Sequence, residues 1–408
     1  MSVVDLTRRP GFRDLLYGQA VSALGDWMGT VAFMALVLEI TGSPTAVGGI
    51  LALRLLPAAV GGPLAARAAD RWDRRYTMLA TDLSRAVMIA LVPFVGGLWW
   101  IYLWAFLLEV ASLVFLPARD ASIPDLVEED ELPLANGLIL GTSYGSIPLG
   151  ALGFAAVAAL PFATIAGRPF ALVFWIDAAT FLVSFALIAR LRVLGSKPAK
   201  SGDEADVGFW GAFRIPLVRA VMPAAAAVAL GLGALFSLGI VFVREVLDAG
   251  DAEFGVLIAL FGLGAILGLA ALQRHADGDA LARTRGGVAA IGLVVAVFSL
   301  TPTLWLADLG AVAFGASAAY TLAAGMSALQ SALDGRERVL AFAAFHVVIR
   351  LALGIAAIGA GLAGDLVGAV EWPLVGSLEP ARVVLLCSGL LVVLSALVVR
   401  VDQVEREG

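Results

Sequence analysis

The sequence has 408 residues, of which 61% are hydrophobic and only 15% are charged, and its formal net charge is −6. Soluble domains carry about a quarter charged residues and about half apolar ones. This composition, sustained along the whole chain, excludes a soluble globular protein and indicates a polytopic membrane protein. The single cysteine, Cys387, permits no internal disulfide, and we expect its thiol to be buried.

Crossing the hydrocarbon core of a bilayer takes about 20 residues of α-helix. Twelve apolar runs approach or exceed that length, and the ninth and tenth are separated only by Thr301-Pro302-Thr303. The expected fold is therefore all-α, with twelve transmembrane helices. The runs lie at roughly 12–39, 45–69, 76–96, 98–118, 134–160, 168–191, 216–243, 253–273, 286–302, 304–326, 337–363 and 381–400.

The basic residues support this count, because Lys and Arg collect in short cytoplasmic loops. With the N-terminus inside, three of the 27 basic residues fall in outer loops, three fall within spans, and the remaining 21 fall in inner loops and tails. We therefore expect both termini to be cytoplasmic. Only two basic residues are lysines, a bias typical of GC-rich bacteria, so we expect a bacterial cytoplasmic membrane. The outer residues are Arg168, Arg244 and Arg382, and those within spans are Arg54, Arg85 and Arg350.

The longest inner connection, "GSKPAKSGDEADVG", is polar and rich in Gly, Ser and charge, which is typical of a flexible linker. It predicts an N-terminal six-helix bundle at 1–191, a linker at 192–213 and a C-terminal six-helix bundle at 214–408. A shift of about 207 residues aligns small residues and an aspartate in the second span of each half, which favours two pseudo-symmetric bundles.

The loop after the second span, "GGPLAARAADRWDRRYTML", combines small residues with acids and arginines. Its pattern resembles the signature of the major facilitator superfamily, with Ala66 and Asp73 at two positions where that signature has glycine. Asp73 is similar to the branch of drug:proton antiporters that includes macrolide exporters and the enterobactin exporter. "LGDW", "TDLSRA", "PARDASIPDLV" and "GRERV" resemble the same branch, so the similarity covers nearly the whole chain.

The resemblance implies a secondary active transporter whose spans one, four, seven and ten line a central cavity. It also implies that the signature loop is a latch, with Asp70 at the start of span eleven. Arg71, Arg74 and Arg75 would then pair with acids such as Asp120 or Asp125. The alternative is that the loop serves only as a topogenic charge cluster. The loop residues of interest are Ala66, Asp70, Arg71, Asp73, Arg74 and Arg75.

Ionisable residues within spans are costly and are therefore functional candidates. Asp26 and Glu109 lie in spans one and four, and each is a candidate proton carrier, because a carboxylate in a low-dielectric cavity binds a proton more readily than one in water. Arg54 lies at the depth of Asp26, so a permanent ion pair between them is an equal alternative. In span eleven, His346 and Arg350 share one helix face and form a candidate proton relay. A structural histidine is the alternative.

Two further groups of polar residues have structural interpretations. We expect Asp177 to have a structural role in span six, and Asp82 and Arg85 to join the charge network of the signature loop. Aromatic and apolar walls suit lipophilic ligands, although helix packing would explain each such residue singly. The candidate cavity residues are Gln19, Trp27, Phe33, Phe236, Phe314 and Tyr320.

We expect a proton-coupled exporter of a lipophilic, drug-like or macrolide-like molecule, monomeric in the bilayer. Two histidines and one cysteine provide no metal-site spacing, and no phosphate-binding loop or basic nucleic-acid surface is present. The sequence therefore predicts no cofactor, no metal, no nucleic-acid partner and no enzymatic activity. The alternatives are export of a siderophore or lysolipid on the same fold, or a membrane assembly protein that does not transport.

Overall fold

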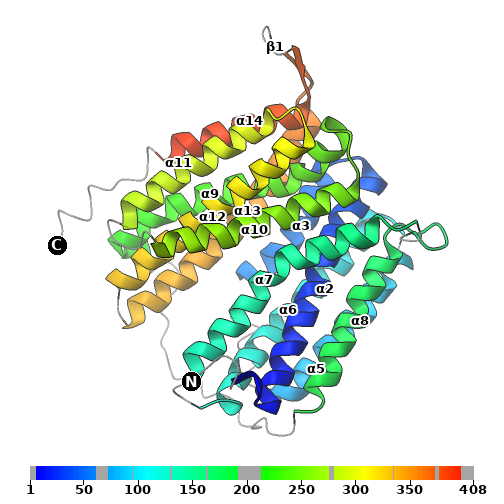
Figure 1. Ribbon diagram of the computed structural model, residues 1–408, viewed down its shortest axis with the longest axis vertical. Helices are drawn as coiled ribbons and strands as arrows, with labels where there is room; N and C mark the ends of the chain where they lie inside the picture. Colours follow the sequence, from blue (N-terminus) through cyan, green and yellow to red (C-terminus); the bar gives the residue numbers. More distant parts are fainter. Residues whose placement is uncertain are drawn as a thin grey trace. The chain divides into compact units, whose positions relative to one another are not determined.

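The computed structural model describes residues 6–60, 72–94, 96–128, 131–161, 164–191, 213–274, 280–333, 335–372 and 376–396. Within these residues, ten helices are long and apolar enough to cross a membrane, and two shorter apolar helices begin at Pro44 and Pro380. Each of the twelve predicted spans is therefore helical over most of its described residues, and the all-α fold class is confirmed. A short hairpin of β1 (Val370–Trp372) and β2 (Gly376–Leu378) projects after span eleven (Figure 1).

The chain divides into two compact units. The first consists of residues 1–36 and 60–204, and the second of residues 37–59 and 205–408. The first unit contains most of α2 (Pro10–Thr41) and all of the helices α5 (Arg74–Leu91), α6 (Leu98–Ser122), α7 (Leu132–Ala158) and α8 (Ala171–Ile188). Helix α5 packs against both α6 and α8.

The second unit contains the remaining helices and also α3, which precedes it in the chain by more than 150 residues. Its members are α3 (Pro44–Val60), α9 (Pro216–Val241), α10 (Asp251–Arg274), α11 (Ala280–Ser299), α12 (Leu304–Ala332), α13 (Gly335–Leu366) and α14 (Pro380–Ser395). Helix α12 packs against α10 and α11, while α13 packs against α9 (Figure 1). The predicted boundary at 192–213 stays a prediction, because these residues lie almost wholly outside the described ones.

Local sequence explains where the helices begin. Pro10, Pro44, Pro216 and Pro380 each open a helix, where the missing N–H costs nothing and the fixed φ suits the first turn. Asp73 instead caps α5, because its carboxylate accepts a hydrogen bond from the Tyr76 backbone N–H at 2.9 Å. In these five helices the start is thus encoded by a proline or by a capping carboxylate.

Several details differ from the prediction. Helix α11 begins at Ala280, six residues before the expected run, because the polar turn containing Arg283 and Thr284 continues the helix. The expectation for Cys387 is wrong, since this residue is exposed on α14. In a transmembrane helix the thiol is apolar enough to face lipid, so exposure carries little cost. The expected break after span nine is confirmed, with α11 ending at Ser299 and α12 starting at Leu304.

Candidate functional site

The first unit contains an ion pair in the interior of a span. Asp82 and Arg85 lie one turn apart on α5 with 0% and 4% of their surfaces exposed, and the guanidinium pairs directly with the carboxylate. At 1.5 Å per residue, Asp82 lies about 12 Å along the helix from Arg74. Burial inside the bundle makes the two charges satisfy each other. Most of the loop, at 61–71, lies outside the described residues, so the expectation that this pair joins the loop network stays a prediction.

Two neighbouring helices hold the Arg85 guanidinium in place. It lies 4.4 Å from the ring centroid of Phe115 on α6 and 4.5 Å from that of Phe181 on α8. It also approaches the Ser112 hydroxyl at 3.5 Å. Aromatic faces stabilise a desolvated cation, so the apolar residues around Arg85 contribute to holding its charge inside the unit.

The two carboxylates predicted as proton carriers lie on other helices of the same unit. Asp26 on α2 is half-buried. Glu109 on α6 is half-buried and lies one turn before Ser112, so both share one face of that helix. We call Asp26, Asp82, Arg85 and Glu109 the intramembrane charge cluster. Sequence reasoning named Asp82 and Arg85 but assigned them to the loop network, although the i, i+3 spacing of an acid and a base inside a span was the signal for a direct pair.

Asp177 on α8 lies against two glycines of α2. A Cβ added at Gly25 would lie 2.6 Å from the Asp177 Oδ1 atom, and one at Gly29 would overlap the Oδ2 atom. Asp177 is fully buried, and Thr180 donates a hydrogen bond of 2.7 Å to its backbone carbonyl. This carboxylate thus occupies a glycine notch on α2, an arrangement that fits the structural role expected for it.

The glycine notch predicts a sharp difference between two Gly→Ala variants. Gly29→Ala should reduce the free energy of unfolding by about 1–3 kcal/mol, the usual cost of overpacking a close contact. Gly141→Ala on α7 is the matched control, because a Cβ there meets nothing within 4 Å. Thermal unfolding of the purified variants in detergent would measure both. Equal stability of the two variants would contradict the notch.

Two arginines of the signature loop that the structure describes, Arg74 and Arg75, connect the start of α5 to the ends of neighbouring helices. Arg74 donates 3.0 Å to the Asp125 carboxylate and 2.7 Å to the Ala121 carbonyl, which confirms one of the two expected pairings. Asp120 pairs with Arg119 instead. Arg75 donates to the Ala189 carbonyl at the end of α8. Ala66, Asp70 and Arg71 lie outside the described residues, so the latch stays a prediction.

Each of the three arginines that were predicted to lie in outer loops binds groups near the ends of other helices. Arg168 donates 2.8 Å to the Pro93 carbonyl and stacks 4.3 Å from the Phe94 ring. Arg244 pairs with Asp251 at 2.6 Å and with Glu39 at 3.3 Å. Arg382 donates 2.8 Å to the carbonyls of Ser299 and Thr301. These three arginines are the exceptions to the expected collection of basic residues in inner loops, and each makes structural contacts that the sequence did not predict.

Helix α3 begins against α13 within the second unit. The Asp365 Oδ2 atom accepts hydrogen bonds from the Ser43 hydroxyl at 2.7 Å and from the Thr45 backbone N–H at 3.1 Å. A side chain from the last turn of α13 thus caps the N-terminus of α3, where unsatisfied N–H groups favour an anion. A Cβ at Gly361 would come within 2.8 Å of the Pro44 carbonyl carbon, so the two helices approach closely.

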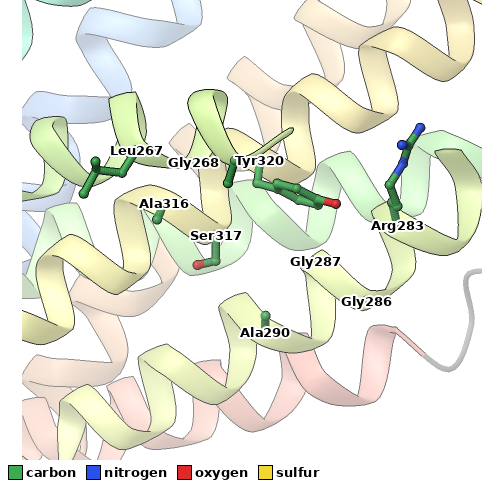
Figure 2. Close-up of a pocket in the computed structure, with 10 residues that line it drawn as sticks. Leu267, Gly268, Arg283, Gly286, Gly287, Ala290, Ala316, Ser317 and Tyr320 are labelled. Atoms are coloured by element: carbon green, nitrogen blue, oxygen red, sulfur yellow. The ribbon is translucent and has the colours of Figure 1, made fainter. Parts of the chain in front are cut away.

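The candidate cavity residues have several environments. Gln19 is 8% exposed and lies 3.5 Å from the Ser143 hydroxyl on α7. Phe33 is fully buried, with its ring 5.1 Å from that of Phe174, so it packs between helices. Phe236 and Phe314 both contact Phe261 in a second aromatic core. Trp27 is half-buried where α7 crosses α2, and Tyr320 lines a groove between α10, α11 and α12 (Figure 2).

The remaining predicted residues are less informative. Arg54 and Arg350 are half-buried, and the side chain of His346 lies outside the described residues. Across the described ranges, no group of three His, Cys, Asp or Glu side chains is placed to hold a metal ion. Charged and polar groups inside the bundle, rather than a metal or catalytic triad, are thus the chemical features that this fold presents.

Helices long enough to span a bilayer, with charged side chains paired inside one unit, define a polytopic helical membrane protein. The chain matches the Major Facilitator Superfamily over residues 15–357, and it belongs to this family of transporters, which is not an enzyme family. It is 25% identical over 293 residues to the "Uncharacterized MFS-type transporter YfiS" of Bacillus subtilis, covering 69% of this chain and 68% of that one. Similarity to YjbB of the same organism is 24% over 378 residues, covering 87% and 89%.

Solved structures show the same fold. A bacterial homolog to the human lysosomal transporter Spinster, in an inward-facing and unoccupied conformation, matches with a TM-score of 0.78 and 17% identity, over 98% of this chain and 96% of that one. The nucleoside transporter NupG matches with a TM-score of 0.69 and 12% identity, over 95% and 98%. These structures show the fold, and membership of the family makes the protein a membrane transporter that binds a small-molecule substrate and is embedded in lipid.

Proposed function

We propose that the protein is a proton-coupled exporter of a lipophilic, drug-like small molecule that works by alternating access. The observation that supports it best is the intramembrane charge cluster, which holds the buried Asp82–Arg85 pair and two half-buried carboxylates within one unit. Buried ionisable groups in transporters mark proton or substrate paths, because their cost in hydrocarbon must otherwise be avoided. Within the family, this cluster favours proton coupling over uncoupled transport.

The charge balance of the cluster gives proton binding a physical basis. Asp82 is fully buried and pairs with Arg85, so its charge is balanced within the unit. Asp26 and Glu109 are carboxylates on other helices of the same unit, and both are half-buried. Asp26 is half-buried whereas Asp82 is fully buried, so Asp26 is the more accessible proton acceptor. Movement of α2 relative to α5 would change the proton affinity.

Several other features belong to this proposal. The excess of arginine at inner ends supports cytoplasmic N- and C-termini in a bacterial inner membrane. The linker at 192–213 would join two bundles, and the protein would act as a monomer. Asp70 would help to close the cytoplasmic side, as a carboxylate favourably placed at a helix N-terminus. The capping of α5 by Asp73 and the Arg74–Asp125 pair would anchor that loop.

Transport by reconstituted protein tests the coupling. In liposomes carrying a pH gradient, wild-type protein should move a lipophilic cationic dye. Asp26→Asn should reduce gradient-driven transport by about tenfold or more, the effect of losing ~1.4 kcal/mol of coupling, because an amide cannot take up the proton. Dye exchange without a gradient should persist in this variant.

The matched control is Asp120→Asn, which removes an exposed acid paired with Arg119 outside the cluster. It should leave gradient-driven transport unchanged. Wild-type transport that is indifferent to the pH gradient would rule out proton coupling. Gradient-driven transport that survives in Asp26→Asn would place the proton site elsewhere in the chain.

A further inference from the structure

The ion pair between Asp82 and Arg85 uses only part of the guanidinium. One terminal nitrogen of Arg85, Nη2, pairs with the Oδ1 atom of Asp82. The Arg85 Nε atom is buried and forms no hydrogen bond with any described residue. Bidentate pairs, in which two parallel N–H groups bind one carboxylate, are the strong form of this contact. Arg85 thus binds Asp82 through a single nitrogen, and its fork is open to a second acceptor.

The other terminal nitrogen of the guanidinium faces α6. Nη1 lies 3.5 Å from the Ser112 hydroxyl oxygen, which is long for a hydrogen bond. Ser112 donates its own hydroxyl hydrogen to the Leu108 carbonyl at 3.1 Å, so it acts as an acceptor towards Arg85. Arg85 therefore lies between two helices, with a carboxylate on its own helix and only a weak, neutral acceptor on the other.

A carboxylate lies one turn away from that weak acceptor. Glu109 precedes Ser112 by three residues on α6, so the two side chains share one face, with about 5–6 Å between their Cβ atoms. Helices α5 and α6 are consecutive spans that pack together and run in opposite directions. The step from Asp82 to Arg85 along α5 therefore has the same direction as the step from Ser112 to Glu109 along α6. A guanidinium that swings away from Asp82 in this direction approaches Glu109.

Two aromatic rings line the position of the guanidinium. Its central carbon lies 4.4 Å from the centroid of the Phe115 ring and 4.5 Å from that of the Phe181 ring. A ring attracts a cation over its whole face and requires no single donor geometry. A charge that moves beside these rings therefore stays stabilised while it changes its carboxylate partner.

Helices α6 and α8 pack against α5 and supply the other titratable groups around it. Asp177 is the one ionisable residue in the sequence of α8, and it faces the glycine notch of α2. Tyr102 lies near the start of α6, and Arg119 and Asp120 pair with each other near its end. Glu109 is therefore the acid that these two helices place closest, along the chain, to the Ser112 contact.

We propose that Arg85 is a charge-exchange residue, which pairs alternately with Asp82 on α5 and with Glu109 on α6. The structure described above places it on Asp82. In either position, the carboxyl group that lacks the guanidinium carries a proton, so the three groups have no net charge. The position of Arg85 thus decides which of the two carboxyl groups is protonated. The exchange is a property of these charges alone, whereas its use in transport rests on the proton coupling proposed above.

Unfolding of the detergent-purified full chain by sodium dodecyl sulfate tests the exchange. Glu109→Gln alone should change the unfolding equilibrium constant little, because Arg85 then stays with Asp82. The same substitution in an Asp82→Asn background should raise that constant about tenfold or more beyond what the two single variants predict together, since the guanidinium loses both carboxylates. Asp120→Asn, on the same helix as Glu109, is the matched control and should be additive with Asp82→Asn.

A nuclear magnetic resonance measurement tests the exchange without a destabilised variant. In protein labelled with nitrogen-15 in arginine only, the Arg85 Nε signal is identified by its loss in Arg85→Lys. Two exchanging environments should give a broadened or doubled signal in wild-type protein. Glu109→Gln leaves Asp82 as the carboxylate partner and should give one sharp signal, while Asp120→Asn should keep the wild-type pattern.

Two results would overturn the proposal and leave Asp82 as the fixed partner of Arg85. These are additive effects of Glu109→Gln and Asp82→Asn on unfolding, and an Arg85 signal that Glu109→Gln does not alter. The proposed proton coupling fails separately. Non-additive unfolding in a protein whose transport ignores the pH gradient would support the exchange and would remove only its link to protons.

Discussion

Replacement of Arg85 by methionine should lower the free energy of unfolding by about 3–5 kcal/mol, the usual cost of removing one partner of a buried ion pair. Methionine retains the contacts with Phe115 and Phe181 but leaves the fully buried Asp82 without its cation. The loss should appear as a lower unfolding temperature and a shorter half-life in detergent.

A double variant separates loss of charge balance from loss of packing. Arg85→Met combined with Asp82→Asn removes both charges and should recover much of the stability, because neutral groups cost less to bury. Arg13→Met serves as the control, since Arg13 pairs with Asp14 at a more exposed position. An Arg85→Met protein as stable as the Arg13→Met protein would show that Asp82 does not depend on this cation.

Arg382→Met should destabilise the second unit by about 2–4 kcal/mol, because hydrogen bonds to a charged donor contribute about 1.5–3 kcal/mol each. The Arg382 guanidinium donates to the carbonyls of Ser299 and Thr301 and to the Glu379 carboxylate, each at 2.8 Å. The first two carbonyls lie at the C-terminal end of α11, where a cation is favourable. Their loss should loosen the turn between α11 and α12.

Hydrogen exchange followed by mass spectrometry measures this effect locally. Peptides covering residues 297–305 should exchange faster in Arg382→Met than in wild type. Arg168→Met is the matched control, because Arg168 binds the Pro93 carbonyl in the first unit. It should accelerate exchange around Pro93 and leave residues 297–305 unchanged. The role assigned to Arg382 would be wrong if both variants left the 297–305 peptides at the wild-type rate.

Features that depend on one segment were predictable. The apolar runs predicted a helix at each of the twelve positions, and Pro302 correctly marked a break between two of them. The pairing of Arg74 with Asp125 was predictable because both residues lie at adjacent ends of neighbouring spans. In these cases the thickness of the bilayer and the short loops determine which ends of the spans can meet, so the place of a residue in the sequence predicts its neighbours.

Features that depend on helix rotation were not predictable. The sequence placed Asp82 and Arg85 near the inner end of span three, but which face of α5 they occupy is decided by packing against α6 and α8. Tyr320 was expected in a central cavity lined by spans one, four, seven and ten, and it lines a groove that span nine also bounds. Apolar residues surround α12 on nearly every side, so the pattern of hydrophobicity does not reveal the rotation of that helix.

The cap that Asp365 places on α3 also orders events during synthesis. Asp365 follows Ser43 by 322 residues, so a ribosome adding about 5–20 residues per second reaches it roughly 15–65 s later. Throughout that interval the N-terminus of α3 lacks its acceptor and the helix lacks its neighbour α13. The second span therefore stays in the bilayer without its cap until α13 has been synthesised. Packing at the N-terminus of α3, a helix made early, is completed only by a helix made late in the chain.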